Sequence, residues 1–273
     1  MFFWRKLFPY LQKYIPRHRS NKFLKKLDKF ATIYHSLYEN LNYDCKNNGE
    51  LFLLNKLNDS NNLNYIFDIG ANIGSYSLLA RQINKKCQIY AFEPVPETYE
   101  TLKENVSNKN INSYNYALGS DIREDKMLVT KDSKLSTLLD NPNLLHKKDN
   151  HYVSIQITTG NKFLKKNNFL SEISLLKIDT EGYESEVLKG FSEIISRINV
   201  IQFEYGKANI FAKYFLKDYF DDYHDDFYIG KLYPNGVDFY EKYEWGLDDF
   251  IGPNFVMVKR CRKDLYDLLS IKN

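Results

Sequence analysis

Cysteine is scarce in this sequence, and its few cysteines are poorly placed for cross-linking. Three occur among 273 residues, at Cys45, Cys87 and Cys261. They are odd in number, far apart and form no CxxC pair, which argues against a disulfide framework and against a cysteine-based metal or redox motif. We therefore expect a cytoplasmic protein, with the inner face of the membrane as an alternative location.

Long apolar runs are also missing. No stretch approaches the roughly 20 apolar residues that span a bilayer. The N-terminus does not resemble an export signal, because Arg5, Lys6, Pro9 and Lys13 interrupt the apolar core that such a signal needs. We expect neither export nor a membrane-spanning segment.

An excess of charge of one sign is the third absence. Lys and Arg number 38 against 35 Asp and Glu, which gives a formal net charge of +3. The whole chain is thus not a polycation built to neutralise phosphates, and we expect no nucleic-acid partner. The 43% hydrophobic and 27% charged content is typical of a globular protein with one substantial core.

Short β-prone runs alternate with helical patterns through the middle of the chain. The candidate strands are 65–69, 88–92, 114–118, 152–158, 174–179 and 200–204. This alternation predicts an α/β fold with a mostly parallel sheet and helices on both faces. The runs 227–232 and 255–258 have no helix between them and predict antiparallel strands that complete the sheet.

Two segments fall outside this alternation. Residues 1–60 look helical and are strongly basic up to residue 29, so we expect an N-terminal helical extension before a domain at 61–273. Residues 120–150 are polar and show no sustained period. We expect 120–160 to form an excursion beside the site, on the substrate side.

Glycine and acidic residues mark the ends of the first two strands. Ligands of open parallel sheets bind at the carboxyl ends of the strands, where the strand order reverses. Asp68 begins a loop in which Gly70 and Gly74 let the backbone pass close to a ligand before a helix starts. Glu93 follows the second strand and can accept both hydroxyls of a ribose. Together these residues predict a nucleoside site.

A dinucleotide is the rival ligand for this loop. Its fingerprint requires glycine where this chain has Asn72 and Ser75. S-adenosylmethionine lacks phosphate and carries a sulfonium and an amino acid group, which suit a loop bearing Asp and Asn. The spacing favours a methyltransferase over a nicotinamide or flavin protein, and over a loop that merely turns a strand into a helix.

Three motifs in order resemble the FkbM family of methyltransferases. They are FDIGANIG at Phe67–Gly74, AFEPVP at Ala91–Pro96 and LKIDTEGYE at Leu176–Glu184. The resemblance covers about residues 63–205 and implies a class I methyltransferase (Rossmann-like) fold that transfers methyl from S-adenosylmethionine. It also implies an acceptor hydroxyl on a sugar or glycoside. Members usually carry a Thr-Leu-Asp stretch where this chain has Thr159–Asn161.

The combined reading gives a set of expected cofactor contacts and an expected acceptor. The cofactor-binding residues are predicted to be Asp68, Gly70, Asn72, Gly74, Tyr76, Glu93, Pro94, Ala117 and Asp179. The acceptor is predicted to be a sugar or glycan in cell-surface polysaccharide or glycoside synthesis. The alternatives are a non-sugar small molecule and a non-catalytic binding module with a degenerate methyltransferase fold.

Three carboxylates are the candidates for chemistry. An alcohol is a poor nucleophile until it loses its proton, so a base is expected within hydrogen-bond reach. Asp179, Glu181 and Glu204 lie at or near the ends of two central strands, with Asp179 the first candidate and Glu181 its partner. Glu181 would equally serve as a carboxylate at a helix N-terminus. Asp179 and Glu204 are also the candidates for a Mg²⁺ site, since oxygen ligands suit a hard cation.

Other polar residues carry weaker expectations. His146, His151 and His224 lie in polar segments, where a surface or structural role is favoured over a general base. Ser136 and Thr137 either touch a sugar or fill a polar loop. A nucleic-acid methyltransferase would show an Asp/Asn-Pro-Pro-Tyr/Phe motif in place of the sequence that begins at Asp179.

The first 20 residues interleave aromatic and basic side chains in the manner of an interfacial segment. One interpretation is peripheral membrane contact through residues 1–20. The other is an added helix that packs Leu7, Leu11 and Ile15 against the core or a second subunit, which leaves the oligomeric state open. Pro9 is expected to interrupt a clean amphipathic helix and favours the packed helix.

Overall fold

The computed structural model describes residues 2–131, 136–139 and 149–272, with residues 2–6 as backbone only. The chain divides into two compact units, Met1–Leu41 and Asn42–Asn273, and each is described by itself. The division comes earlier than the boundary we expected after residue 60, because α3 (Glu50–Asp59) is part of the larger unit and buries three leucines there. No helix in the described ranges is long and apolar enough to cross a bilayer.

The smaller unit contains two helices, α1 (Phe2–Arg17) and α2 (Lys22–Tyr38). The Asn21 side chain caps α2 by accepting the N–H groups of Phe23 and Leu24 at 2.9 and 3.2 Å. Helix α1 continues through Pro9, contrary to our expectation of an interruption there. Pro9 removes one backbone hydrogen bond, and the turns on either side keep the helical path.

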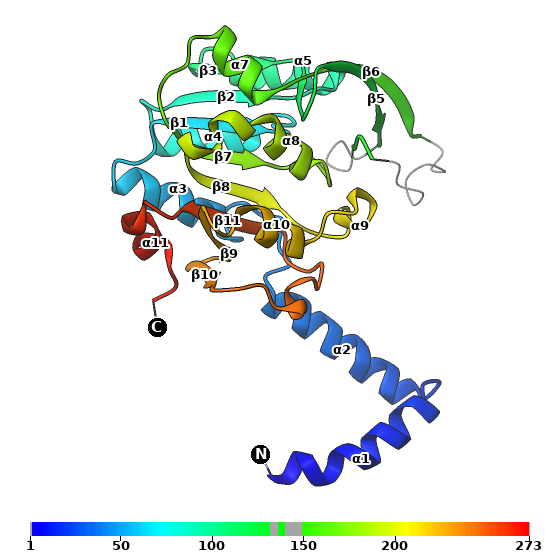
Figure 1. Cartoon of the computed structure of the whole chain (residues 1–273). Coiled ribbons are helices and arrows are strands. Elements are labelled where there is room, and N and C mark those ends of the chain that lie inside the picture. Colours follow the sequence, from blue (N-terminus) through cyan, green and yellow to red (C-terminus); the bar gives the residue numbers. More distant parts are fainter. Residues whose placement is uncertain (1, 132–135, 140–148, 273) are drawn as a thin grey trace. The chain divides into compact units, whose positions relative to one another are not determined.

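The larger unit is built on a sheet that has eight strands in the described part of the chain, in the order β10-β9-β11-β8-β7-β1-β2-β3 (Figure 1). Strands β3, β2, β1, β7 and β8 run parallel, and β11 is antiparallel to both β8 and β9. This confirms the predicted parallel sheet with antiparallel strands at one end. The bounds are β1 (Tyr65–Ile69), β2 (Gln88–Phe92), β3 (Ile111–Tyr114), β7 (Ile173–Ile178), β8 (Ile198–Glu204), β9 (Phe227–Tyr233), β10 (Gly236–Tyr240) and β11 (Asn254–Lys259).

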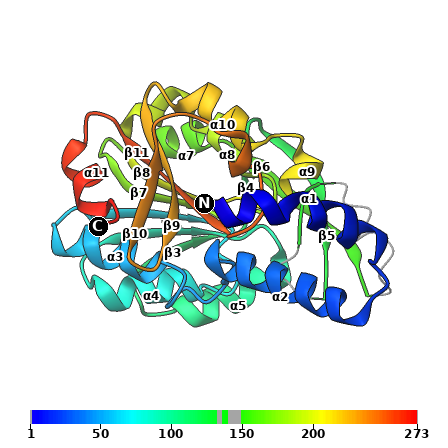
Figure 2. The ribbon, with the colours of Figure 1, turned by 90° about the horizontal axis from the view of Figure 1, so that it is seen from below.

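Helices cover both faces of this sheet, as predicted (Figure 2). Helix α3, α4 (Ser75–Ile83), α5 (Pro96–Val106) and α11 (Lys263–Leu269) pack on one face. On the other lie α7 (Gly160–Lys166), α8 (Glu184–Gly190) and α10 (Leu216–Tyr223). Successive strand residues alternate between the two faces, so Ile66 enters one core and Phe67 the other. Short elements complete the unit: η2 (Ser192–Arg197), α9 (Asn209–Ala212) and η3 (Trp245–Leu247).

A second, smaller sheet corrects two of our strand predictions. It consists of β4 (Ala117–Leu118), β5 (Arg123–Val129) and β6 (His151–Thr158) within the described residues. The predicted strand 114–118 is therefore split, since β3 ends at Tyr114 and β4 belongs to the other sheet. The predicted strand 152–158 pairs with β5 and not with the main sheet.

Strand β5 lies in the stretch that we expected to be irregular. Its first four residues are charged, which hides the strand pattern, and only Met127, Leu128 and Val129 are buried. Residues 132–135 and 140–148 of the predicted excursion, with His146, lie outside the described residues.

Candidate active site

The register of the parallel strands brings the predicted site residues together. Ile69 pairs with Phe92 and with Ile178, and Ile178 pairs with Phe203. These four residues stand at the carboxyl ends of β1, β2, β7 and β8. The residues that follow them, Gly70, Glu93, Asp179 and Glu204, therefore emerge at one edge of the sheet, where ligands of such sheets bind.

A cavity of about 610 Å³ opens at this edge. Its volume falls within the roughly 300–1,000 Å³ typical of small-molecule sites. Asp68 and Gly74 do not line it. The predicted residues that do are Gly70, Asn72, Tyr76, Glu93, Pro94, Ala117, Asp179, Glu181 and Glu204.

The two loop glycines are explained by contacts within the protein. Gly70 has φ +80°, and a Cβ there would lie 1.8 Å from the backbone oxygen of Asp179, so the two loops touch through their backbones. Gly74 has φ +87°, and its Cβ would lie 2.7 Å from Leu102 of α5. Gly74 thus allows α4 and α5 to pack, whereas we expected it to approach a ligand.

Glu93 is held by the backbone on both carboxylate oxygens. It accepts the N–H of Asn72 on Oε2 and the N–H of Val95 on Oε1, each at 3.0 Å. The side chain is 6% exposed. Burial raises the pKa of Glu93 to about 7, against the opposite effect of the two hydrogen bonds. Each oxygen keeps a second lone pair, which leaves the carboxylate able to accept two hydroxyl groups.

Lys177 is the main residue that we missed from the sequence. Its Nζ lies 3.1 Å from Asp179 Oδ2 and 3.5 Å from Asp68 Oδ1, and 5.0 Å from the ring centre of Tyr76. Asp68 is fully buried and also accepts the Ser77 hydroxyl at 2.7 Å. Burial by itself would lower the pKa of Lys177, but the surrounding carboxylates raise it above its ordinary value. Asp68 therefore does not line the cavity and pairs instead with Lys177, which does.

Glu50 is a second residue that we missed, because it lies within the segment assigned to the N-terminal extension. It lines the cavity from the start of α3. Its carboxylate accepts the side-chain amide of Gln202 at 2.6 Å and that of Asn48 at 3.0 Å. Burial raises the pKa of Glu50. No local sequence pattern marks Glu50, because its partner Gln202 lies on β8, far away along the chain.

Three carboxylates meet in the wall of the cavity. Asp179, Glu181 and Glu204 each offer an oxygen atom within 4.8 Å of the others. Glu204 shares a hydrogen bond with Asp179, and burial together with both neighbouring carboxylates raises its pKa well above the ordinary range. Two carboxylates this close hold a proton between them more readily than either would alone.

The helix-terminal role that we considered for Glu181 belongs to Glu184. The Glu184 carboxylate accepts the N–H groups of Thr180 and Gly182 at 2.9 and 3.1 Å, in front of α8. It is fully buried, and burial raises the pKa of Glu184 to about 7. Glu181 itself has φ +54° and lines the cavity.

The described part of the 120–160 excursion lies beside the cavity. The Thr137 hydroxyl donates to the backbone oxygen of Glu181 at 2.9 Å. Ser136 lines the cavity, and its hydroxyl accepts the N–H of Thr130 at 3.2 Å. The excursion is therefore fastened to the loop that carries the acidic residues.

The histidines and the Thr159–Asn161 stretch lie elsewhere. His151 and His224 are not among the lining residues of the cavity. The ring of His224 stacks on that of Phe220, with 5.5 Å between the ring centres. Thr159 caps α7 by accepting the N–H of Lys162 at 3.0 Å. Residues 159–161, where the family usually carries Thr-Leu-Asp, are not among the lining residues of the cavity.

The strand order, with antiparallel β11 inserted beside the parallel strands, and the site at their carboxyl ends define a class I methyltransferase fold. The chain belongs to the methyltransferase FkbM domain family, whose model matches residues 68–227. This confirms the family that the three motifs resemble.

Several known proteins are similar to this chain. Methyltransferase 1 of Beauveria bassiana (strain ARSEF 2860) is 28% identical over 149 residues, which cover 47% of this chain and 59% of the relative. The hexuronic acid methyltransferase AglP of Haloferax volcanii is 26% identical over 142 residues, which cover 50% and 53%. The crystal structure of methyltransferase FkbM from Methylobacillus flagellatus KT aligns with a TM-score of 0.43 and 15% identity, over 72% of this chain and 44% of that one. This chain spans between about half and three fifths of the curated relatives it matches.

Proposed function

We propose that this chain is an S-adenosylmethionine-dependent O-methyltransferase that acts on a hydroxyl of a sugar or glycan, in the synthesis of cell-surface polysaccharide or of glycosides. The observation that carries the proposal is the strand register, which brings Glu93, Asp179 and Glu204 to the edge of one cavity in a chain of the FkbM family. A hexuronic acid methyltransferase among the relatives supports a sugar acceptor.

The residues present fit S-adenosylmethionine better than a dinucleotide. Glu93 can accept the ribose hydroxyls, and Phe92 and Leu118 give the cavity apolar wall for an adenine. Among the described lining residues the one basic side chain is Lys177, which is already held by Asp68 and Asp179. A pyrophosphate would therefore meet carboxylates and no available cation, whereas a sulfonium and an ammonium group suit this wall.

The chain's own residues supply positioning and proton transfer. When bound, S-adenosylmethionine supplies an electrophilic methyl group. The Asp179 carboxylate takes the proton of the acceptor hydroxyl, while Lys177 holds that carboxylate in place at 3.1 Å. Glu204 also holds Asp179, through the hydrogen bond that the two side chains share. In such displacements, alignment of the reactants and exclusion of water lower the free energy of activation by on the order of 7–11 kcal/mol.

Cofactor binding and methyl transfer test the proposal in two steps. S-adenosylmethionine and its demethylated product are expected to raise the melting temperature of the full chain, because a ligand selective for the native state stabilises it. Mass spectrometry of surface glycans from cells with and without the protein is then expected to show the loss of one CH₂ increment. Absence of binding by calorimetry would refute the cofactor assignment.

The same assays separate the alternatives. Binding without any methyl transfer to glycan fractions would indicate a non-catalytic module. If EDTA abolishes turnover and Mg²⁺ restores it, then Asp179, Glu181 and Glu204 act as metal ligands, since three carboxylates offer the oxygen atoms that a hard cation takes. Turnover that is indifferent to EDTA leaves Asp179 as the base.

A further inference from the structure

Helix α2 carries a continuous stripe of exposed apolar side chains. None of its residues is buried. The stripe comprises Phe23, Leu27, Phe30, Tyr34 and Leu37, which recur in steps of four and three and therefore share one side of the helix. Phe23 is 72% exposed, Phe30 66% and Leu37 70%. Large apolar side chains gathered in this way mark a binding surface.

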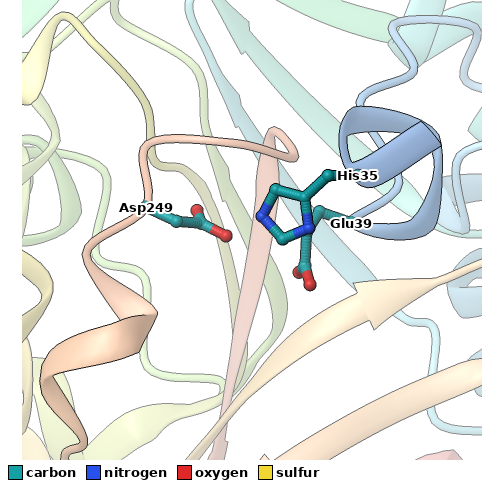
Figure 3. Close-up of side chains that lie close together, drawn as sticks. All are labelled: His35, Glu39 and Asp249. Atoms are coloured by element: carbon teal, nitrogen blue, oxygen red, sulfur yellow. The ribbon is translucent and has the colours of Figure 1, made fainter. Parts of the chain in front are cut away.

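Basic residues flank the stripe and acidic residues avoid it. At 3.6 residues per turn, Lys22, Lys26 and Lys29 fall along one edge of the stripe. Asp28 and the C-cap residue Glu39 fall on the side that faces away from the stripe, and Lys25 lies on that side with them. Figure 3 shows the side chain of Glu39 close to that of His35, one turn earlier at the end of α2. The helix thus presents apolar and basic groups together and keeps its acidic groups behind.

Helix α1 and the turn after it continue this pattern. Phe8, Tyr10 and Tyr14 are exposed on α1, and Arg17 and Arg19 follow at its end. Over residues 7–41 the chain carries seven basic residues (13, 17, 19, 22, 25, 26 and 29) against two acidic ones (28 and 39). The basic excess in these 35 positions is five, whereas the whole chain has a net charge of +3.

The charge decides between the possible occupants. A second copy of this unit would set seven basic residues against another seven, and their repulsion opposes pairing through the stripe. An anionic bilayer offers negative headgroups for the lysines and an acyl boundary for the phenylalanines. Tyrosines suit the same layer, because their rings are apolar and their hydroxyls reach water.

We propose that residues 7–41 form a docking surface for an anionic lipid bilayer. The α2 stripe lies at the acyl boundary, with Lys22, Lys26 and Lys29 at the headgroups. This extends the surface beyond the first 20 residues, to the end of α2. It does not depend on the proposed methyl transfer, and either can fail without the other.

Vesicle sedimentation with the full chain tests the surface. Vesicles of phosphatidylcholine and phosphatidylglycerol are expected to bind the protein, phosphatidylcholine alone is not, and salt is expected to weaken binding. Each lysine near anionic lipid contributes roughly fivefold in affinity, so Lys22→Glu, Lys26→Glu and Lys29→Glu together are expected to weaken binding by at least ~100-fold. The double variant Phe23→Ser with Phe30→Ser is expected to weaken vesicle binding in both low and high salt, because salt screens charges but does not weaken apolar contacts.

Matched variants on the larger unit control for nonspecific electrostatic and hydrophobic binding to the vesicles. Exposed Lys85, Lys86 and Lys165 are changed to Glu for the charge control, and Leu170 and Trp245, 87% and 88% exposed, are changed to Ser for the apolar control. Both controls are expected to bind vesicles like the parent. Circular dichroism melting shows that each variant folds.

Three outcomes overturn the proposal. One is a parent protein that ignores anionic vesicles. Another is a concentration-dependent oligomer, seen by light scattering, that Phe23→Ser with Phe30→Ser dissociates; the stripe then pairs two copies. The third is binding that the larger-unit controls weaken as much as the α2 variants do.

Discussion

The two halves of the cavity are built in different ways. The Glu93 half comes from one short stretch of chain, Asp68 to Val95, and backbone N–H groups hold both oxygens of the Glu93 carboxylate. The Asp179 half gathers residues from α3, the excursion, the β7–α8 loop and β8, and it crowds carboxylates around Lys177. The first half is prepared by local backbone, and the second depends on charges brought from a distance. Substitutions in the two halves should therefore affect cofactor affinity and turnover separately.

Lys177→Met should have the largest effect and damage both halves. It removes the cation from between Asp68 and Asp179 and leaves a fully buried carboxylate without its charge partner. Breaking a buried pair in this way costs about 3–5 kcal/mol of the free energy of unfolding. Urea denaturation of parent and variant measures this loss.

The double variant Lys177→Met with Asp68→Asn is the matched control for that experiment. Removal of the orphaned charge is expected to recover part of the lost stability. If Lys177→Met alone unfolds at the same urea concentration as the parent, the ion pair does not hold the two halves together.

Asp179→Asn should affect turnover far more than cofactor affinity. A general base typically contributes 10²–10⁴-fold to the rate, and its amide cannot take the proton. Calorimetry and steady-state methyl transfer on the same preparation compare the two quantities. Glu181→Gln is the control, because Glu181 lines the same cavity and offers an oxygen atom within 4.8 Å of Asp179. Equal losses of affinity and catalytic efficiency in Asp179→Asn would contradict its assignment as base.

Glu93→Ala should have the smallest effect, confined to the cofactor. Loss of charge-assisted hydrogen bonds weakens binding of S-adenosylmethionine and its product by roughly 1.5–3 kcal/mol. Glu93→Gln keeps the shape and removes the charge, which separates the two contributions. Unchanged affinity in both variants would remove Glu93 from the site.

The pH dependence sharpens the same test. Because the pKa of Glu93 lies near 7, its carboxylate ionises as the pH rises toward that value, and cofactor affinity is expected to rise with it and level off above. The free energy of unfolding of the unliganded protein is expected to change in the opposite direction. Between pH of about 4.5 and about 7 the folded chain holds a proton that the unfolded chain has lost, so stability falls as the pH rises. Glu93→Gln is expected to flatten the affinity curve.

Local patterns predicted the Glu93 half well. The first two strands have the bounds expected from their apolar runs, because glycine or proline follows each run closely and ends it. The same patterns failed for β5, whose charged first half pairs with β6 and needs no apolar face. They also failed for α3, which reads as part of a basic extension but buries its leucines in the larger unit.

The sequence by itself determined the parallel α/β fold, the family and the edge of the sheet at which the cavity opens, because these follow from short motifs and from the alternation of strands and helices. Only the tertiary structure decided that Lys177 pairs with Asp68, that Glu50 reaches the cavity, and that Glu184 takes the place we considered for Glu181. The first two depend on side chains from different strands and helices. A buried charge is specified by partners that folding brings near, and no local pattern records them.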